Sequence, residues 1–364
     1  FDATRMPLGK LQKATVLEGY DVLKQISNVI GCASANTSSS SGGSTGISGG
    51  STGISGGSSG ISGGSGGLGI VGAAGRAEIE RLTNAFYTVI PHVSARNVRL
   101  ELIDTPAKLK AKIEMVEALG EIEIASRVID TKHPTFDMHP IDAKYAQLNA
   151  KLRPIDTADP MHHFLDEYLQ NTHAATHATY RLKLTQAFEI EREGEACSFN
   201  ETVGNRQLLW HGSRLSNWCG ILSQGLRIAP PEAPVTGYMF GKGVYFADAS
   251  SKSANYCFAN RQSPEGVLLL SEVALGSQYE RLGAEYEAAA SCCRAGKQST
   301  WGKGKTAPDP SGTVPLPGSS NVSVPRGKHA PTGVNSGHLQ YNEFIVYNLC
   351  QIKQRFVLQV KFCY

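Results

Sequence analysis

The chain has 364 residues, of which 41% are hydrophobic and 18% charged, and its formal net charge is +3 at pH 7. This composition is typical of a soluble globular protein with enough residues for two or three domains. The nearly balanced charge argues against a dedicated nucleic-acid-binding surface, and no apolar run approaches the roughly 18 residues of a membrane span. The chain begins with Phe1 and no signal-peptide pattern follows, so we expect a fragment or a processed product.

The cysteines are scattered along the chain, and none of them forms a C-x-x-C pair or lies near a suitably spaced pair of histidines. This distribution predicts reduced thiols in an intracellular compartment and no structural zinc site. The eight cysteines are Cys32, Cys197, Cys219, Cys257, Cys292, Cys293, Cys350 and Cys363.

Residues 1–140 show helical periodicity interrupted by one low-complexity segment. Apolar residues recur at helical spacing over 7–30 and again over 79–90, and a third helix is predicted after Thr105, with proline in its first turn. The Gly/Ser repeat of period seven within 33–72 has too few apolar residues for a core and predicts a flexible, disordered insertion. We therefore expect an all-helical region with one disordered insertion.

Residues 141–364 have a different pattern, in which short β-type runs dominate. Short helices are expected at 145–152, 164–170, 216–224 and 250–257, and a long Gly/Pro-rich loop or hairpin at 276–338. Few helical crossovers separate the strands, which predicts an α+β fold: an N-terminal helical bundle followed by a mainly antiparallel β domain. The predicted strands are 182–192, 207–212, 243–248, 266–275, 341–348 and 355–362.

Three short motifs lack the context that their chemistry needs. GSGGLG at 64–69 matches a dinucleotide fingerprint but lies in the Gly/Ser repeat, with no strand before it. GKGKT at 302–306 ends like a P-loop but lacks the first glycine and a preceding apolar strand. HAATH at 173–177 has no glutamate between its histidines and no third ligand, so structural histidines are favoured and no metal site is predicted.

One carboxylate is unusual for its surroundings. Glu343 lies in the run YNEFIVYN at 341–348, whose period-two pattern predicts a strand of largely apolar, β-branched and aromatic residues. Burying a charge is costly unless it is paired or used. The pattern leaves two interpretations open: a strand glutamate paired with a lysine, or a catalytic carboxylate.

The most specific stretch of the chain is residues 207–258, which read QLLWHGSRLSNWCGILSQGLRIAPPEAPVTGYMFGKGVYFADASSKSANYCF. This stretch resembles the catalytic signature of the poly(ADP-ribose) polymerases, and in particular of the DNA-damage-responsive members. The resemblance extends through MPLGKL, NAFYTVIPH, NTHAATH, EIEREGE and YNEFIVYN, and so covers nearly the whole chain outside the Gly/Ser repeat. The His, Tyr and Glu that define the active branch of the family match His211, Tyr245 and Glu343.

The resemblance implies a site for NAD⁺, which is consumed as an ADP-ribose donor, so that no separate cofactor is expected. The backbone of Gly212 and the hydroxyl of Ser213 would hold the nicotinamide carboxamide, and His211 would bind a ribose hydroxyl. Tyr245 and Tyr256 would stack on the cationic ring. Other expected donor-site residues are Asn217, Arg227, Gly243 and Ser253, together with the loop 229–243.

Glu343 is the expected catalytic carboxylate. It would stabilise positive charge that develops on the ribose and would act as a general base toward the acceptor hydroxyl. Lys252 is its expected neighbour and is included among the catalytic residues, while Met239 and Tyr341 are expected on the acceptor side.

Residues 1–140 resemble the family's regulatory helical domain, whose first helices would precede Phe1. The implied function is poly(ADP-ribosyl) transfer to proteins and to the chain itself, in the nucleus and in the DNA damage response. DNA would act only through modules upstream, no membrane is involved, and we expect basal activity with little DNA dependence. Two alternatives stay open: a mono-ADP-ribosyl transferase with the same site, and a catalytically silent binding or scaffold module.

Overall fold

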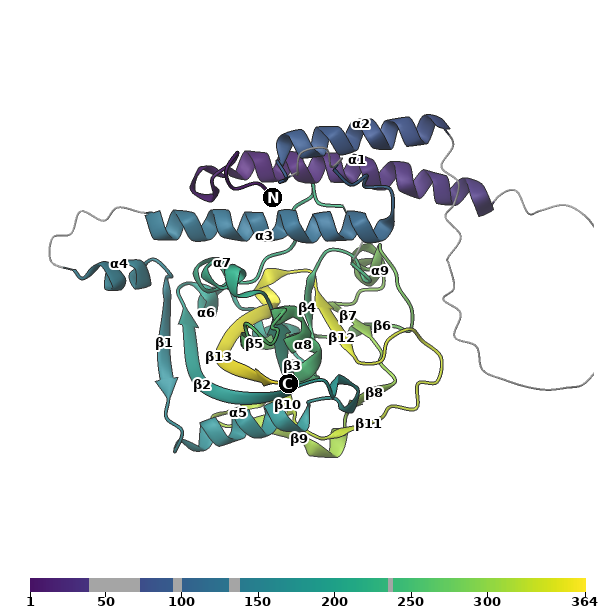
Figure 1. Ribbon diagram of the computed structural model, residues 1–364. Coiled ribbons are helices and arrows are strands. Elements are labelled where there is room, and N and C mark those ends of the chain that lie inside the picture. Colours follow the sequence, from purple (N-terminus) through teal and green to yellow (C-terminus); the bar gives the residue numbers. More distant parts are fainter. Residues whose placement is uncertain (39–72, 94–99, 131–137, 235–237) are drawn as a thin grey trace, which may run out of the picture.

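The structure is a computed structural model and describes residues 1–38, 73–93, 100–130, 138–234 and 238–364. It consists of a helical layer next to a β-rich domain (Figure 1). The third long helix lies between the other two and the β-rich domain, which agrees with the predicted division into an all-helical part and an α+β part.

The helical part contains three long helices: α1 (Lys13–Ser38), α2 (Ala73–Val89) and α3 (Pro106–Asp130). The predicted start of α3 is confirmed, because Pro106 is its first residue and the Thr105 hydroxyl accepts a hydrogen bond from the Lys108 backbone N–H at 3.3 Å. Buried apolar side chains from all three helices, among them Leu23 and Phe86, form one core.

The Gly/Ser segment lies mostly outside the described residues, and so does the motif GSGGLG. The structure does describe the backbone of residues 33–38, which sequence analysis placed in that segment and which continue helix α1 as far as Ser38. Among the described residues, no helix is both long and apolar enough to cross a membrane. The seven cysteines whose side chains are described form no disulfide.

The β-rich domain contains one large and one smaller sheet, with short helices around them. The helices are α4 (Pro140–Ala146), α5 (Pro160–Asn171), α6 (Glu195–Ser198), α7 (Trp218–Gln224), α8 (Ser250–Ala254) and α9 (Ala288–Arg294). The strands are β1 (Ala150–Ile155), β2 (Arg181–Arg192), β3 (Arg206–Gly212), β4 (Val244–Phe246), β5 (Glu265–Ala274), β6 (Gln278–Arg281), β7 (Ser299–Gly302), β8 (Thr306–Pro308), β9 (Thr313–Leu316), β10 (Ser319–Pro325), β11 (His329–Pro331), β12 (Glu343–Val346) and β13 (Ile352–Cys363). Short 3-10 helices are η1 (Leu8–Lys10), η2 (Ala175–His177), η3 (Glu201–Val203), η4 (Leu215–Asn217), η5 (Asn255–Cys257), η6 (Pro310–Gly312) and η7 (Leu349–Gln351).

The large sheet has seven strands in the order β1-β2-β13-β5-β3-β10-β9, and only β3 and β10 pair in parallel. The second sheet has the order β4-β12-β7-β6, with β6 and β7 parallel, and β11 pairs with β8. The expectation of a mainly antiparallel α+β domain is therefore confirmed. The two sheets meet where β3 bridges the end of β4, through Trp210 and Ala247.

Two secondary-structure expectations were wrong. The helix predicted at 145–152 ends at Ala146; Asn149 adopts a left-handed turn with φ 49°, and β1 begins at Ala150. Pairing of β1 with β2 decides this, since the backbone hydrogen bonds come from a partner strand some forty residues away. The segment 276–338, predicted as a long loop or hairpin, contains the hairpin of β9 and β10 but also strands β6, β7, β8 and β11 and helix α9, which are too short for a clear period.

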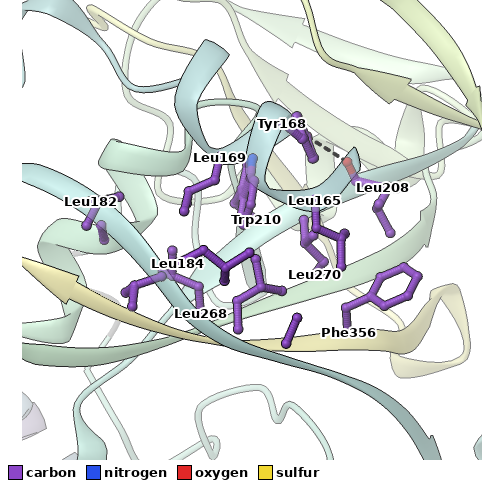
Figure 2. Close-up of a cluster of buried hydrophobic side chains, with 14 of the residues drawn as sticks. Leu165, Tyr168, Leu169, Leu182, Leu184, Leu208, Trp210, Leu268, Leu270 and Phe356 are labelled. Atoms are coloured by element: carbon purple, nitrogen blue, oxygen red, sulfur yellow. Dashed lines mark hydrogen bonds between the residues drawn. The ribbon is translucent and has the colours of Figure 1, made fainter. Parts of the chain in front are cut away.

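The core of the large sheet fixes the strand that enters the functional site. In Figure 2, helix α5 packs against β3 and its neighbours, and the Tyr168 hydroxyl donates a hydrogen bond to the Leu208 carbonyl at 2.9 Å. Trp210 on β3 is fully buried and its ring lies 4.7 Å from that of Tyr168, centroid to centroid. The next two residues, His211 and Gly212, are the last of β3, and the buried core therefore holds them in place.

Candidate active site

A cavity of about 430 Å³ lies between helix α3 and the β domain. Its β-domain wall comes from the end of β3, from β4, from α8 and η5, and from the start of β12. The lining residues there include His211, Gly212, Ser213, Asn217, Met239, Tyr245, Lys252, Ser253, Tyr256 and Glu343. Ten of the residues predicted from sequence thus surround one space.

The His211 ring is held in one tautomer. Its Nδ1 lies 2.9 Å from the Tyr245 carbonyl oxygen, which can only accept, so Nδ1 carries the proton. Burial lowers the pKa of His211, which favours the neutral ring. The Nε2 atom is therefore an acceptor, suited to a ligand hydroxyl.

Gly212 lies directly against helix α8. A Cβ at this position would be 1.9 Å from the carbonyl oxygen of Ser253, so only glycine fits here. The Ser253 hydroxyl donates to the Trp210 carbonyl at 3.0 Å, and the Ser213 Oγ accepts from Asn217 Nδ2 at 2.9 Å. Ser213 keeps its own O–H for a ligand, next to the Gly212 backbone.

The Tyr245 hydroxyl is occupied by the protein itself. It accepts a hydrogen bond from the Phe240 N–H at 2.9 Å and donates one to the Gly241 carbonyl at 2.7 Å. Burial raises the pKa of Tyr245, so the hydroxyl stays protonated. The ring, rather than the hydroxyl, is thus available to the cavity. Tyr256 also lines the cavity and is 55% exposed, as befits a residue at its mouth.

Glu343 and Lys252 form an ion pair at the floor of the cavity, with Lys252 Nζ 2.8 Å from Glu343 Oε1. Their side chains are 14% and 15% exposed, respectively. Burial lowers the pKa of Lys252, and the carboxylate of Glu343 opposes this effect. The other oxygen, Glu343 Oε2, is buried and has no hydrogen-bond partner within the described part of the chain. The paired-glutamate interpretation is therefore true of one oxygen, while the second is not paired with any described residue.

Three predicted residues do not line the cavity. Arg227 forms an ion pair with Glu121 of helix α3. The Tyr341 side chain is buried, and its hydroxyl contacts that of Thr176. Gly243 allows β4 to approach β12, because a Cβ there would lie 2.5 Å from Ile345 Cγ2. These residues support the walls of the site in this structure.

Both parts of the chain match known family models. Residues 163–362 match the poly(ADP-ribose) polymerase catalytic domain, and residues 1–145 match the poly(ADP-ribose) polymerase regulatory domain. The chain belongs to the poly(ADP-ribose) polymerase family.

Curated relatives of the same family are similar to this chain over its full length. Identity is 46% to poly(ADP-ribose) polymerase 2-A of Oryza sativa subsp. japonica, with 100% of this chain and 48% of the relative covered. Identity is 44% to poly(ADP-ribose) polymerase 2 of Homo sapiens, of which 54% is covered, and 40% to poly(ADP-ribose) polymerase 1 of Gallus gallus, of which 32% is covered. The chain spans about half the length of the first of these poly(ADP-ribose) polymerases.

Sequence reasoning missed the wall of the cavity that faces the β domain. That wall is one face of helix α3 and consists of Lys110, Ile113, Glu114, Glu117 and Ala118. These residues recur at three- and four-residue spacing, so a polar stripe beside the apolar one was the available signal. Nothing in the spacing says which partner the stripe faces, because that depends on how α3 docks.

Sequence reasoning also missed Arg214, Tyr238 and Phe258, which line the same cavity. The Arg214 guanidinium lies over the Phe258 ring, 3.4 Å from its centroid. Phe258 has a left-handed backbone with φ 54°, which is unusual for an aromatic residue. Contacts of this kind join residues far apart in sequence and leave no local pattern.

The structure accounts for the HAATH histidines without a ligand. His173 Nε2 lies 3.1 Å from the His177 carbonyl oxygen, and His177 Nδ1 lies 2.8 Å from the Ser251 hydroxyl. Among the described residues, no group of three or more His, Cys, Asp or Glu side chains is arranged to hold a metal ion. Each histidine thus has a ring nitrogen in contact with a protein group.

Proposed function

We propose that this chain is an NAD⁺-dependent poly(ADP-ribosyl) transferase. It cleaves the nicotinamide glycosidic bond and transfers and elongates ADP-ribose on protein acceptors, including itself. The observation that carries the proposal is Glu343, which lines one cavity with His211 and Tyr245 and has one oxygen held by Lys252 and the other without a hydrogen-bond partner among the described residues. The names of the relatives, and the catalytic-domain match over 163–362, support it.

Donor binding follows from the groups that line the cavity. The Gly212 backbone and the Ser213 O–H would bind the nicotinamide carboxamide, and the rings of Tyr245 and Tyr256 would contact the pyridinium. His211 would accept a hydrogen bond from a ribose hydroxyl through Nε2, since Nδ1 is committed to Tyr245. NAD⁺ is consumed in this scheme, and no further cofactor or metal is proposed.

The chemical step needs a carboxylate at one position. As the bond between ribose C1′ and the nicotinamide nitrogen breaks, nicotinamide leaves with the electron pair and positive charge develops on the ribose. A carboxylate in a partly desolvated cavity stabilises that charge more strongly than water does. The acceptor hydroxyl then bonds to C1′ and gives its proton to Glu343, which acts as the general base.

Helix α3 supplies the proposed regulation. It forms one wall of the cavity, and it belongs to the part of the chain that matches the regulatory-domain model. We propose that this helical part restrains access of NAD⁺. We expect the chain to show basal activity with little response to nicked DNA. A large stimulation by nicked DNA would contradict this part of the proposal. Action in the nucleus, in the DNA damage response, is proposed from the relatives alone.

Incubation with labelled NAD⁺, with and without benzamide as a nicotinamide mimic, tests the function, and the products are sized on a gel. We expect long polymers that benzamide suppresses, and Glu343→Gln should remove elongation. A ladder that stops at one unit would instead identify a mono-ADP-ribosyl transferase. Benzamide binding without release of nicotinamide would identify a silent binding module. Wild-type chain lengths from Glu343→Gln would overturn the role of Glu343.

A further inference from the structure

A second carboxylate lies behind the active-site glutamate and is not explained by the proposed chemistry. Asp248 lies two residues before the start of helix α8, in the short link from β4, and the residue is 3% exposed. Its Oδ2 accepts a hydrogen bond from Asn342 Nδ2 at 2.7 Å, while its Oδ1 is buried and has no hydrogen-bond partner in the described ranges. Among the described residues it forms no ion pair within 4.0 Å. A buried carboxylate of this kind is costly and needs a reason.

The partner of Asp248 is the residue immediately before Glu343. Asn342 is 4% exposed, and its Oδ1 accepts a hydrogen bond from the Gly304 backbone N–H at 2.9 Å. One amide side chain therefore joins the start of α8 to the segment after β7. Both of its polar atoms are used, so its orientation is determined.

Lys252 lies one helical turn after Asp248 and contacts the same short segment of chain. Its Nζ donates to the Tyr341 carbonyl at 3.3 Å, to the Asn342 carbonyl at 3.1 Å and to Glu343 Oε1 at 2.8 Å. An ammonium group has three protons, and these three contacts use all of them. Asp248 and Lys252 thus hold consecutive residues, one through a side chain and the other through backbone and carboxylate.

We propose that Asp248 and Asn342 form a positioning pair for the catalytic carboxylate. The pair fixes the backbone before Glu343, so that Lys252 holds Oε1 and the carboxylate keeps its place in the cavity wall. Neither Asp248 nor Asn342 lines the cavity, so both act through Glu343 rather than on the substrate. The inference rests on the proposed function for its effect on rate, but the geometry it predicts is independent of activity.

Single substitutions in the pair, followed by the exchange of its two residues, test this proposal. Asn342→Asp removes the amide donor and places a second carboxyl group against Asp248, and we expect kcat for NAD⁺ cleavage to fall about 10- to 100-fold, since a hydrogen bond to a charged group is lost. KM for NAD⁺ should change by less than about threefold, because the donor contacts remain. Asp248→Asn alone should be mild, because its carbonyl still accepts from Asn342 Nδ2.

The double variant Asp248→Asn with Asn342→Asp restores one donor and one acceptor, and it should recover kcat to within about fivefold of wild type. Failure of this rescue, with folding intact, would overturn the pair. Asn260→Asp is the matched control, since Asn260 is exposed and accepts only backbone hydrogen bonds through Oδ1. Benzamide affinity should be equal in all variants, which reports an intact cavity.

Crystal structures of the variants separate this proposal from the proposed function. In Asn342→Asp the contact between Lys252 and Glu343 should be lost or lengthened, and in the double variant it should return. An unchanged contact in Asn342→Asp would refute the positioning role. Wild-type protein that releases no nicotinamide would refute the proposed function alone, and the crystallographic comparison would still decide the pair.

Discussion

Glu121 on helix α3 forms an ion pair with Arg227 in the segment that follows helix α7, so one pair of charges joins the helical part to the β domain. Glu121 is 15% exposed and Arg227 36% exposed, and neither residue is among those that line the cavity. The family resemblance assigns Arg227 to the adenosine side of NAD⁺. In this structure the guanidinium is instead bound by a carboxylate of the regulatory part.

Release of this ion pair should favour the donor. In Glu121→Gln the attraction to Arg227 is reduced, and we expect KM for NAD⁺ to fall about two- to fivefold with kcat little changed, as suits a partly exposed pair. Steady-state kinetics of nicotinamide release measure this. Glu78→Gln, which removes an exposed ion pair with Arg81 on α2, serves as the control. A KM that stays equal or rises would show that the pair does not compete with NAD⁺.

The acidic face of α3 should make NAD⁺ binding depend on pH. Glu117 lines the cavity, and desolvation there, together with the carboxylates of Glu121 and Glu114, raises its pKa to about 7. As the pH falls from 8 to 6, Glu117 becomes neutral and repels the pyrophosphate less, so KM for NAD⁺ should decrease. The same raised pKa means that its contribution to stability is largest below about 4.5 and is lost as the pH rises through 7.

Glu117→Gln tests the origin of that dependence. The substitution keeps the shape and removes the titrating group, so it should hold KM near its low-pH value and flatten its change between pH 6 and 8. Measurement of KM at five or six pH values for both proteins decides the matter. An equally steep dependence in Glu117→Gln would assign it to another group.

The close contact at Gly212 predicts a large effect from the smallest substitution. In Gly212→Ala the new methyl group meets the backbone carbonyl of Ser253, which cannot move without shifting helix α8. We expect a loss of about 1–3 kcal/mol in the free energy of unfolding and at least a tenfold loss of benzamide affinity. Gly31→Ala is the contrast: a Cβ there meets nothing within 4 Å on helix α1, and helix propensity predicts a gain of about 1 kcal/mol. Denaturant titration and calorimetry provide both numbers.

The ring of Tyr245 should contribute to ligand binding and its hydroxyl to stability. Tyr245→Phe keeps the ring but leaves the Phe240 N–H without its partner, which costs about 1–3 kcal/mol of stability if the group stays buried. Benzamide affinity should fall less than about fivefold in Tyr245→Phe and more than tenfold in Tyr245→Ala, since the latter also loses the stacking surface. Equal losses in both variants would show that the hydroxyl contacts the ligand directly.

Arg214 should contribute charge to donor binding. It lines the cavity over Phe258 and forms no ion pair among the described residues. The pyrophosphate of NAD⁺ carries two negative charges, so Arg214→Gln should raise KM for NAD⁺ about tenfold, as for loss of a charge-assisted hydrogen bond. Benzamide affinity should not change, because benzamide lacks phosphate. Arg294→Gln on the exposed side of α9 controls for net charge.

Sequence periodicity was sufficient for the long elements of this protein. Helix α3 begins at Pro106 as predicted, and strands β2, β3, β5 and β13 lie where the β-type runs indicated, because each pattern is set by which face of the element is buried. The same reasoning failed at 145–152 and at 276–338. In those regions several short segments, among them β1 and β7, become strands through pairing with partners that are distant in the chain.

The sequence by itself determined the residue types of the site: His211, Tyr245 and Glu343 stand in stretches specific enough to indicate one family. Only the tertiary structure decided how they are used. It committed the Tyr245 hydroxyl to Phe240 and Gly241, gave one oxygen of Glu343 to Lys252, and placed α3 across the cavity. The reason is physical. Local sequence sets which face of an element is apolar, whereas hydrogen-bond partners and docked surfaces depend on segments that meet only after folding.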